Sequence, residues 1–402
     1  MSKRPSATPA RKNTKRLKPS VESTVFSLHD VAGIKQHFDV FGYVVVRVLD
    51  KTGCQKAIAE QVRKILLKQP WEEKLEVRDR ETDEVLNIDR DEERYVKELT
   101  TPCIPKAALE HYDRVAPFHK RFGACCDPSA FHLRTVWRIR QAEPLYAIAK
   151  ELLGESKIYT TIDRPIQKMP SMGDEEFLHW DFPILDTDNR TDDHPMLCGK
   201  VAFTESTFVC VPGTHTLDFA LEFRSLYEDL YPNAKITAPK FGLDPKKDDP
   251  LELREARQSI DVPAGCAVFW SPCLLHGTEK SPGDSGISFG AYIGYMRDID
   301  RSKYKDERQD RINSYLLGKA PARYYSLDPV CYYPKRYDNF PHMLEPYVNK
   351  TPLDYVGRGE RVIQSGPNKG KSVPVLVPVP DPDYVPFPLT QLGYRLLGSE
   401  PW

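Results

Sequence analysis

From Lys157 onward the chain consists of short runs of β-branched and aromatic residues, separated by clusters of proline, glycine and aspartate. Runs of this length and composition predict strands bounded by turns. A series of such strands is typical of sandwiches and barrels. We therefore expect a mainly β fold with flanking helices, whose core is a double-stranded β-helix, that is, a jelly roll.

The segment before these strands alternates helical and extended patterns. The charged stretch from Trp71 to Glu98 predicts exposed irregular structure. Gly154 predicts the end of the last helix before the strands begin. Apolar periodicity predicts helices at Asp30 to Phe41, Thr52 to Leu67, Ala107 to Phe122 and Pro144 to Leu153, with a strand at Tyr43 to Val48.

His179 and Asp181 occur in the sequence Leu178-His179-Trp180-Asp181. Side chains alternate faces along a strand, so these two project to one side while Trp180 points away. The run Cys266–Trp270 predicts a later strand, and His276 follows it. Two histidines and one carboxylate can bind one face of a metal and leave the other face open, an arrangement that suits Fe(II) oxygenases.

The order of the surrounding motifs resembles the phytanoyl-CoA dioxygenase family of Fe(II)/2-oxoglutarate oxygenases. The opening strand at Phe41 to Val46, the His-x-Asp pair, the turn Pro212-Gly213-Thr214-His215 and the distal His276 follow one another as in that family. The resemblance covers roughly residues 25 to 296. It implies a cupin-like jelly roll that binds iron through His179, Asp181 and His276.

The resemblance also implies 2-oxoglutarate as co-substrate and O2 as oxidant. Related halogenases have a small residue in place of the carboxylate, so Asp181 favours hydroxylation or desaturation. His194, in the acidic loop after the pair, is expected to be a surface residue, and His215 to be structural rather than a fourth ligand. The substrate stays open among a small molecule, a protein side chain and a nucleobase.

One family position is missing. The family usually has an arginine about eleven residues after the distal histidine, where its planar fork pairs with the far carboxylate of 2-oxoglutarate. Here that position is Ile287. Arg297 has the same strand parity but lies roughly 33 Å further along an extended strand. Lys200, on the strand after the metal pair, and Lys168, at the family's basic position before it, are the candidate replacements.

Composition limits the class of protein. The chain has 57 basic and 58 acidic residues among 402, so bulk charge does not favour a polyanion binder. The nine cysteines include no Cys-x-x-Cys pair, and the N-terminus lacks a signal-peptide pattern, which favours reduced thiols in an intracellular protein that is not secreted. No apolar run is long enough to predict a membrane span.

The first twenty residues are polar and contain seven basic residues and no acidic residue. Such a segment does not bury enough surface to fold alone. Two basic clusters separated by a short spacer resemble a bipartite nuclear-import signal, so we expect an import receptor as a partner and a nuclear or cytoplasmic location. A solvating tail and a nucleic-acid-binding arm are the alternatives.

We therefore expect a basic tail at residues 1–24, the oxygenase domain at 25–298 and a Tyr/Pro-rich extension at 299–402. The tyrosines of the extension alternate with basic residues, which suits either packing against the barrel or base stacking. The segment Val373 to Pro388 is proline-rich and is expected to be extended. The alternative function is a metal-binding barrel with another co-substrate or little turnover, serving as a nuclear binding or scaffold module.

Overall fold

The structure is a computed structural model. It describes residues 24–61, 75–78, 85–88, 118–119, 124–125, 131–168, 177–181, 196–230, 242–243, 253, 255–278, 287–298, 305–318, 355–362, 370, 372–378 and 384–402. The N-terminal basic segment up to residue 23 and the loop that contains His194 lie outside these residues.

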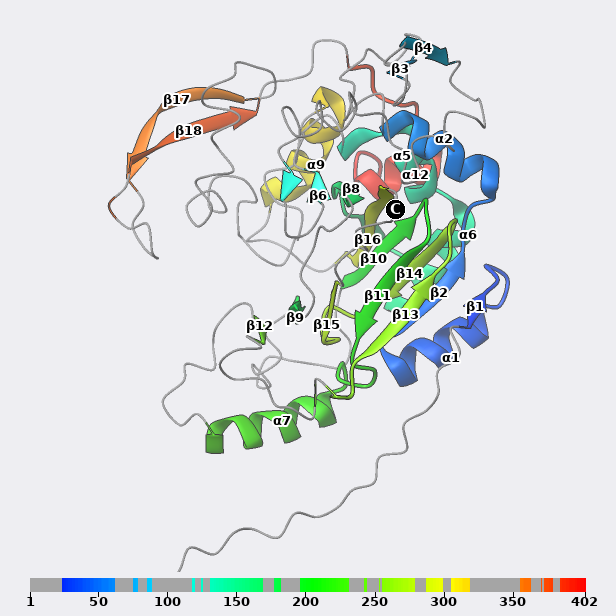
Figure 1. Cartoon of the computed structure of the whole chain (residues 1–402), viewed down its shortest axis with the longest axis vertical. Coiled ribbons are helices and arrows are strands. Elements are labelled where there is room, and N and C mark those ends of the chain that lie inside the picture. The colour runs from blue at the N-terminus through cyan, green and yellow to red at the C-terminus, as the bar shows by residue number, and fades with distance from the viewer. Residues whose placement is uncertain are drawn as a thin grey trace, which may run out of the picture.

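Nine of the described strands form a large sheet (Figure 1). Its order is β1-β2-β14-β10-β16-β8-β6-β5, and β7 also pairs with β16. The β1–β2 pair is parallel and the other pairs are antiparallel. The strands are β1 (Val25–Phe26), β2 (Tyr43–Arg47), β5 (Phe118–His119), β6 (Ala124–Cys125), β7 (Ile158–Thr160), β8 (Pro165–Lys168), β10 (Met196–Ala202), β14 (Cys266–Trp270) and β16 (Ser288–Arg297).

A second, smaller sheet has the order β12-β9-β15-β11-β13, and all its pairs are antiparallel. Two sheets of mixed sequence order agree with the jelly-roll prediction. Its strands are β9 (Phe177–His179), β11 (Ser206–Cys210), β12 (Gly242–Leu243), β13 (Gln258–Val262) and β15 (His276–Thr278).

Apolar side chains from both sheets form a common core between them. Val45, Val268 and Trp270 contribute from the large sheet, and Phe208 and Ile260 from the small one. Because helices cover the opposite face of the large sheet, its central strands are buried on both faces. β14, for example, is buried at every position. This explains why its sequence is a continuous apolar run rather than an alternating one.

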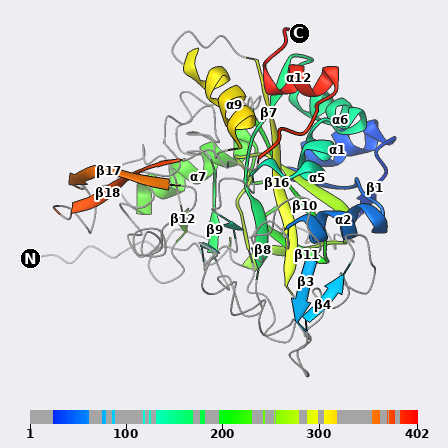
Figure 2. The same cartoon turned by 90° about the horizontal axis from the view of Figure 1, so that it is seen from above.

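Helices α1 (Val31–Phe41), α2 (Lys51–Gln61), α5 (Arg134–Arg140) and α6 (Glu143–Leu153) pack on the outer face of the large sheet (Figure 2). The Asp30 side chain accepts a hydrogen bond from the backbone N–H of Gly33 and caps the start of α1. Gly42 ends α1 with φ 79°, and Gly154 ends α6 with φ 65°. The predicted helix boundaries at these glycines are confirmed.

A single helix, α7 (Leu217–Leu230), packs on the outer face of the small sheet among the described residues. It contributes Phe223 to a cluster with Trp180 and Leu275. Trp180 is fully buried, with its ring centroid 5.5 Å from that of Phe223. Trp180 therefore points away from the space between the sheets, as strand alternation predicts.

Part of the C-terminal region packs on the helices of the large sheet. Helices α9 (Lys305–Leu317) and α12 (Gln391–Leu397) belong to it. The side-chain oxygen of Gln141 accepts hydrogen bonds from the backbone N–H and the hydroxyl of Thr390, and Trp402 stacks on Tyr146 with ring centroids 5.5 Å apart. Residues 384–402 thus belong to the same packed body as α5 and α6.

Two expectations need correction. The stretch expected to be irregular contains a hairpin of β3 (Leu75–Arg78) and β4 (Val85–Ile88). Residues 118–119, within an expected helix, form a strand. The proline-rich segment is extended, as predicted, where it contributes β18 (Ser372–Pro378), which pairs with β17 (Tyr355–Val362). These residues form strands because they pair with neighbouring strands, and local composition does not predict such pairing.

No helix among the described residues combines the length and the apolar composition that crossing a membrane requires.

Candidate metal centre

The pairing of β9 with β15 brings the two histidines together. His179 and His276 are direct partners in this antiparallel pair, and their ring centroids lie 4.5 Å apart. In a pair of this kind, directly opposed residues project to the same face. Two residues about a hundred positions apart in the chain therefore become neighbours once the small sheet forms.

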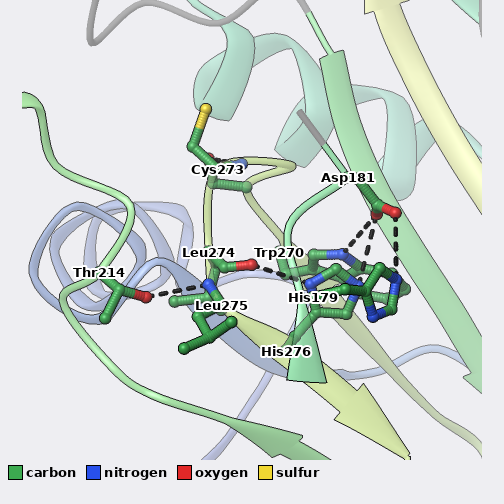
Figure 3. A network of polar contacts seen from close by, with 9 residues as sticks. His179, Asp181, Thr214, Trp270, Cys273, Leu274, Leu275 and His276 are labelled. Carbon is green, nitrogen blue, oxygen red and sulfur yellow. Dashed lines mark hydrogen bonds and ion pairs between the residues drawn. The ribbon is translucent and has the colours of Figure 1, made fainter. Parts of the chain in front are cut away.

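Asp181 completes the group just beyond the end of β9. Its backbone N–H donates to the carbonyl of Pro272, which fixes where the strand leaves the sheet. Its Oδ1 lies 3.4 Å from Nε2 of His179, and its Oδ2 lies 3.4 Å from Nε2 of His276 (Figure 3). One ligand atom from each of the three residues lies within 4.8 Å of the others. This is the group that the sequence predicts.

His276 is held in the form that binds metal. Its Nδ1 lies 2.8 Å from the carbonyl oxygen of Leu274, and because a carbonyl only accepts, Nδ1 carries the hydrogen. Nε2 then carries a lone pair that is available to a cation beside it. Burial lowers the pKa of His276 to about 4, so the ring is neutral at neutral pH.

The Pro-Gly-Thr-His turn supports this histidine from behind. The Thr214 hydroxyl donates to the carbonyl of Val211 at 2.8 Å and accepts from the backbone N–H of Leu275 at 2.9 Å. His215 lies elsewhere, with Nε2 3.2 Å from the carbonyl oxygen of Asp39 at the end of α1. Thr214 thus holds the backbone next to His276, while His215 links the turn to a helix.

Aromatic rings from both sheets enclose the inner side of the centre. The Trp270 ring centroid lies 5.2 Å from that of His276, and the Phe208 centroid lies 5.9 Å from it. Trp270 Nε1 also donates to Oδ2 of Asp181 at 3.4 Å. The side chains of Asp181 and His276 are 9% and 7% exposed, against 25% for His179. Solvent therefore reaches the centre mainly past His179.

Sequence reasoning missed Trp270 as part of the site. The sequence pattern places it only in the apolar strand that precedes His276. The sequence did contain a signal for it. Trp270 lies two residues after Val268, so both project from the same strand face, and Trp270 ends the strand that leads to the distal histidine.

The two candidate lysines lie on the metal-facing side of the large sheet. Lys200 pairs with Tyr292, and Lys168 pairs with Ser288; both partners lie on one face of β16. The Lys200 ammonium donates to the Ser206 hydroxyl at 2.6 Å and to the carbonyl of Thr207 at 3.2 Å. Burial, followed by the charge of Lys168, lowers the pKa of Lys200 to about 7.

The residue at the position of the missing arginine, Ile287, faces the helices and not the metal centre. Ile287 is buried in the cluster that the helices form on the outer face of the large sheet. Arg297 lies at the far end of β16. A cation that sequence reasoning did not consider, Arg164, lies over the ring of Tyr292 at 5.2 Å and pairs with Asp163 at 3.6 Å.

Two facing sheets with two histidines and a carboxylate grouped between them define the class of mononuclear non-haem metal enzymes. The donor set fits Fe(II), since imidazole nitrogen and carboxylate oxygen both bind it and the neutral His276 offers its lone pair. The phytanoyl-CoA dioxygenase (PhyH) family model matches residues 38–285, which is more than half of the chain. The chain belongs to this family, and it is an iron- and 2-oxoglutarate-dependent oxidoreductase.

Solved structures with a similar fold were also found. The epimerase SnoN in complex with Fe3+, alpha-ketoglutarate and nogalamycin RO has 16% identity and a TM-score of 0.39 over 66% of this chain and 83% of its own. EctD from S. alaskensis with bound Fe has 14% identity and a TM-score of 0.39. The match covers 70% of this chain and 82% of EctD. HygX from Streptomyces hygroscopicus with nickel and 2-oxoglutarate bound has 13% identity and a TM-score of 0.38. The match covers 66% of this chain and 87% of HygX.

Because these TM-scores are low, the family assignment rests on the match to the family model and not on the solved structures. A search of curated proteins found no significant match. These comparisons give no support to the alternative of a nuclear scaffold module.

Proposed function

We propose that this protein hydroxylates an organic substrate, with iron held by His179, Asp181 and His276 and with 2-oxoglutarate as co-substrate. The observation that carries the proposal is the convergence of the three side chains around one point, with His276 fixed in its metal-binding tautomer. Asp181 supplies a carboxylate where the related halogenases have a small residue, which favours hydroxylation over halogenation. Bound iron would supply the activation of O2.

The protein's own residues would supply position and shielding. His276 and His179 would each offer a ring nitrogen to the metal, and Asp181 would balance part of the charge of the cation. Trp270 and Phe208 exclude water from the inner side, which strengthens electrostatic interactions there. The more exposed side, beside His179, is where a substrate would enter.

We further propose that Lys200 binds the far carboxylate of 2-oxoglutarate. The ammonium has three N–H donors, and Ser206 and Thr207 accept two of them. One donor is left for a carboxylate. The lowered pKa of this amine also favours the arrival of an anion, because an anion would stabilise the charged form. Lys168 is close enough to act on Lys200 electrostatically and is the second candidate contact.

An anaerobic titration of the Fe(II)-loaded protein with 2-oxoglutarate tests both proposals without a substrate. Chelation of 2-oxoglutarate to iron produces a visible charge-transfer band. We expect a saturable band in the wild type, no iron binding in His179→Ala or Asp181→Ala, and a normal iron content with a much weaker 2-oxoglutarate affinity in Lys200→Met.

The outcomes separate the alternatives. A wild type that binds iron and gives no band would overturn 2-oxoglutarate as co-substrate, and it would favour the barrel with another co-substrate. A band with unchanged affinity in Lys200→Met would overturn the role of Lys200 alone. Full iron binding in either ligand variant would mean that the metal ligands are wrong.

A further inference from the structure

Trp270 contacts two of the three candidate ligands. Its indole N–H donates to Oδ2 of Asp181 at 3.4 Å, and its ring lies against His276 with centroids 5.2 Å apart. The side chain is 5% exposed, so the indole has little room to turn. An inference about this residue depends on the metal site of the proposed function.

Cys198 reaches the same carboxylate from the neighbouring strand. It is the direct cross-strand partner of Trp270 and is 4% exposed. The Cys198 thiol donates a hydrogen bond to the carboxylate of Asp181. Two adjacent side chains of the large sheet thus donate to a carboxylate that belongs to the small sheet.

The indole donor makes the two oxygens of Asp181 unequal. Each oxygen lies 3.4 Å from a different imidazole, so distance alone does not distinguish them. The indole N–H, however, occupies Oδ2. A hydrogen bond draws electron density from the oxygen that accepts it, and the other oxygen becomes the better donor to a cation.

We propose that Trp270, supported by Cys198, is a positioning residue that holds Asp181 through Oδ2 and leaves Oδ1 for the divalent cation. A carboxylate that binds through one oxygen occupies one coordination position rather than two. The positions left free are those that the co-substrate and O2 need. The same contacts join the two sheets at the metal centre.

A packing role alone would give a different result, and the chain contains a matched control for it. Trp180 is also a fully buried tryptophan, and it stands between the two ligands on β9. Its ring packs on Phe223, on the opposite face of the small sheet. Trp180→Phe therefore loses a buried indole next to the site without removing a donor to Asp181.

The test uses Co(II) as the probe, on the full-length protein without iron. Its dissociation constant and its visible absorption bands, which report coordination number and geometry, are measured for the wild type, Trp270→Phe and Trp180→Phe. Trp270→Phe keeps an aromatic ring and loses the N–H donor together with part of the buried indole, and Trp180→Phe matches the second loss without the first. We expect it to weaken Co(II) binding by about tenfold or more, as is usual when a partner of a metal ligand is removed, and to change the bands.

Trp180→Phe should leave the dissociation constant and the bands of the wild type intact. A folded Trp270→Phe with the constant and bands of the wild type would overturn the proposal, as would an equal loss in both variants. If Trp270→Phe does not fold, Cys198→Ala and Cys198→Ser decide. Weaker binding in the alanine variant that serine restores supports the proposal, and an unchanged alanine variant overturns it. A wild type that does not bind Co(II) would count against the metal site itself.

Discussion

Replacing Lys200 with methionine should make the protein more stable while it weakens 2-oxoglutarate binding. The side chain is partly buried, and its pKa falls from 10.5 to about 7. A shift of this size corresponds to a cost on the order of 5 kcal/mol for keeping the ammonium charged in the folded protein. Methionine keeps a flexible apolar stem of similar length and carries no charge.

The expected gain is smaller than this cost. Part of the side chain still reaches solvent, and methionine leaves the Ser206 hydroxyl and the Thr207 carbonyl without the ammonium as partner. Each lost hydrogen bond costs about 1 kcal/mol. We expect Lys200→Met to raise the free energy of unfolding by about 2 kcal/mol at pH 7, once these losses are subtracted from a screened charge term.

Urea unfolding of the metal-free protein at several pH values is the assay. Because the pKa of Lys200 is lower in the folded state, the charge cost is fully present below about pH 7 and disappears as the pH rises toward 10.5. The advantage of the variant should shrink over the same range. A variant that is less stable than the wild type at pH 7, or whose advantage does not change with pH, would refute the reasoning.

Three other predictions concern the co-substrate, the turn and the tail. The dissociation constant for 2-oxoglutarate should rise about fifteenfold between pH 7 and pH 8.5, because only the protonated form of Lys200 binds and its pKa is about 7. Lys200→Arg, whose guanidinium stays charged, should lose this dependence; a titration at both pH values checks it. Thr214→Val leaves the buried N–H of Leu275 without its partner and should lower the free energy of unfolding by about 1–3 kcal/mol in urea. Residues 1–24 fused to a fluorescent protein should direct it to the nucleus, and a diffuse distribution would favour a solvating tail.

The fold class and the family could be predicted because their signals are local and ordered along the chain. Short strands, glycine stops and the His-x-Asp pair each depend on a few consecutive residues. The three candidate ligands also come together in the structure. Their binding of iron, and the roles of Lys168 and Lys200, stay predictions.

The parts that could not be predicted depend on tertiary register. The placement of β16, β10 and β11 in the two sheets decides two such features. Ile287 faces the helices, and Lys200 reaches Ser206. Trp270 acquires its contact with Asp181 only when the two sheets face each other. The hairpin of β3 and β4 was missed because charged residues occupy its sequence, and strand pairing outweighed that composition.

The pairing of β9 with β15 has a consequence for how the protein responds to metal. Each strand has three residues, and about a hundred residues separate their histidines in the chain. So short a pair closes a long loop with few hydrogen bonds of its own. An ion bound to both strands would act as a clip across the loop, and its binding free energy would add directly to the stability of the small sheet. Loss of the ion should therefore increase hydrogen exchange in β9 and β15 well before it affects the large sheet, so that iron supply controls local order as well as catalysis.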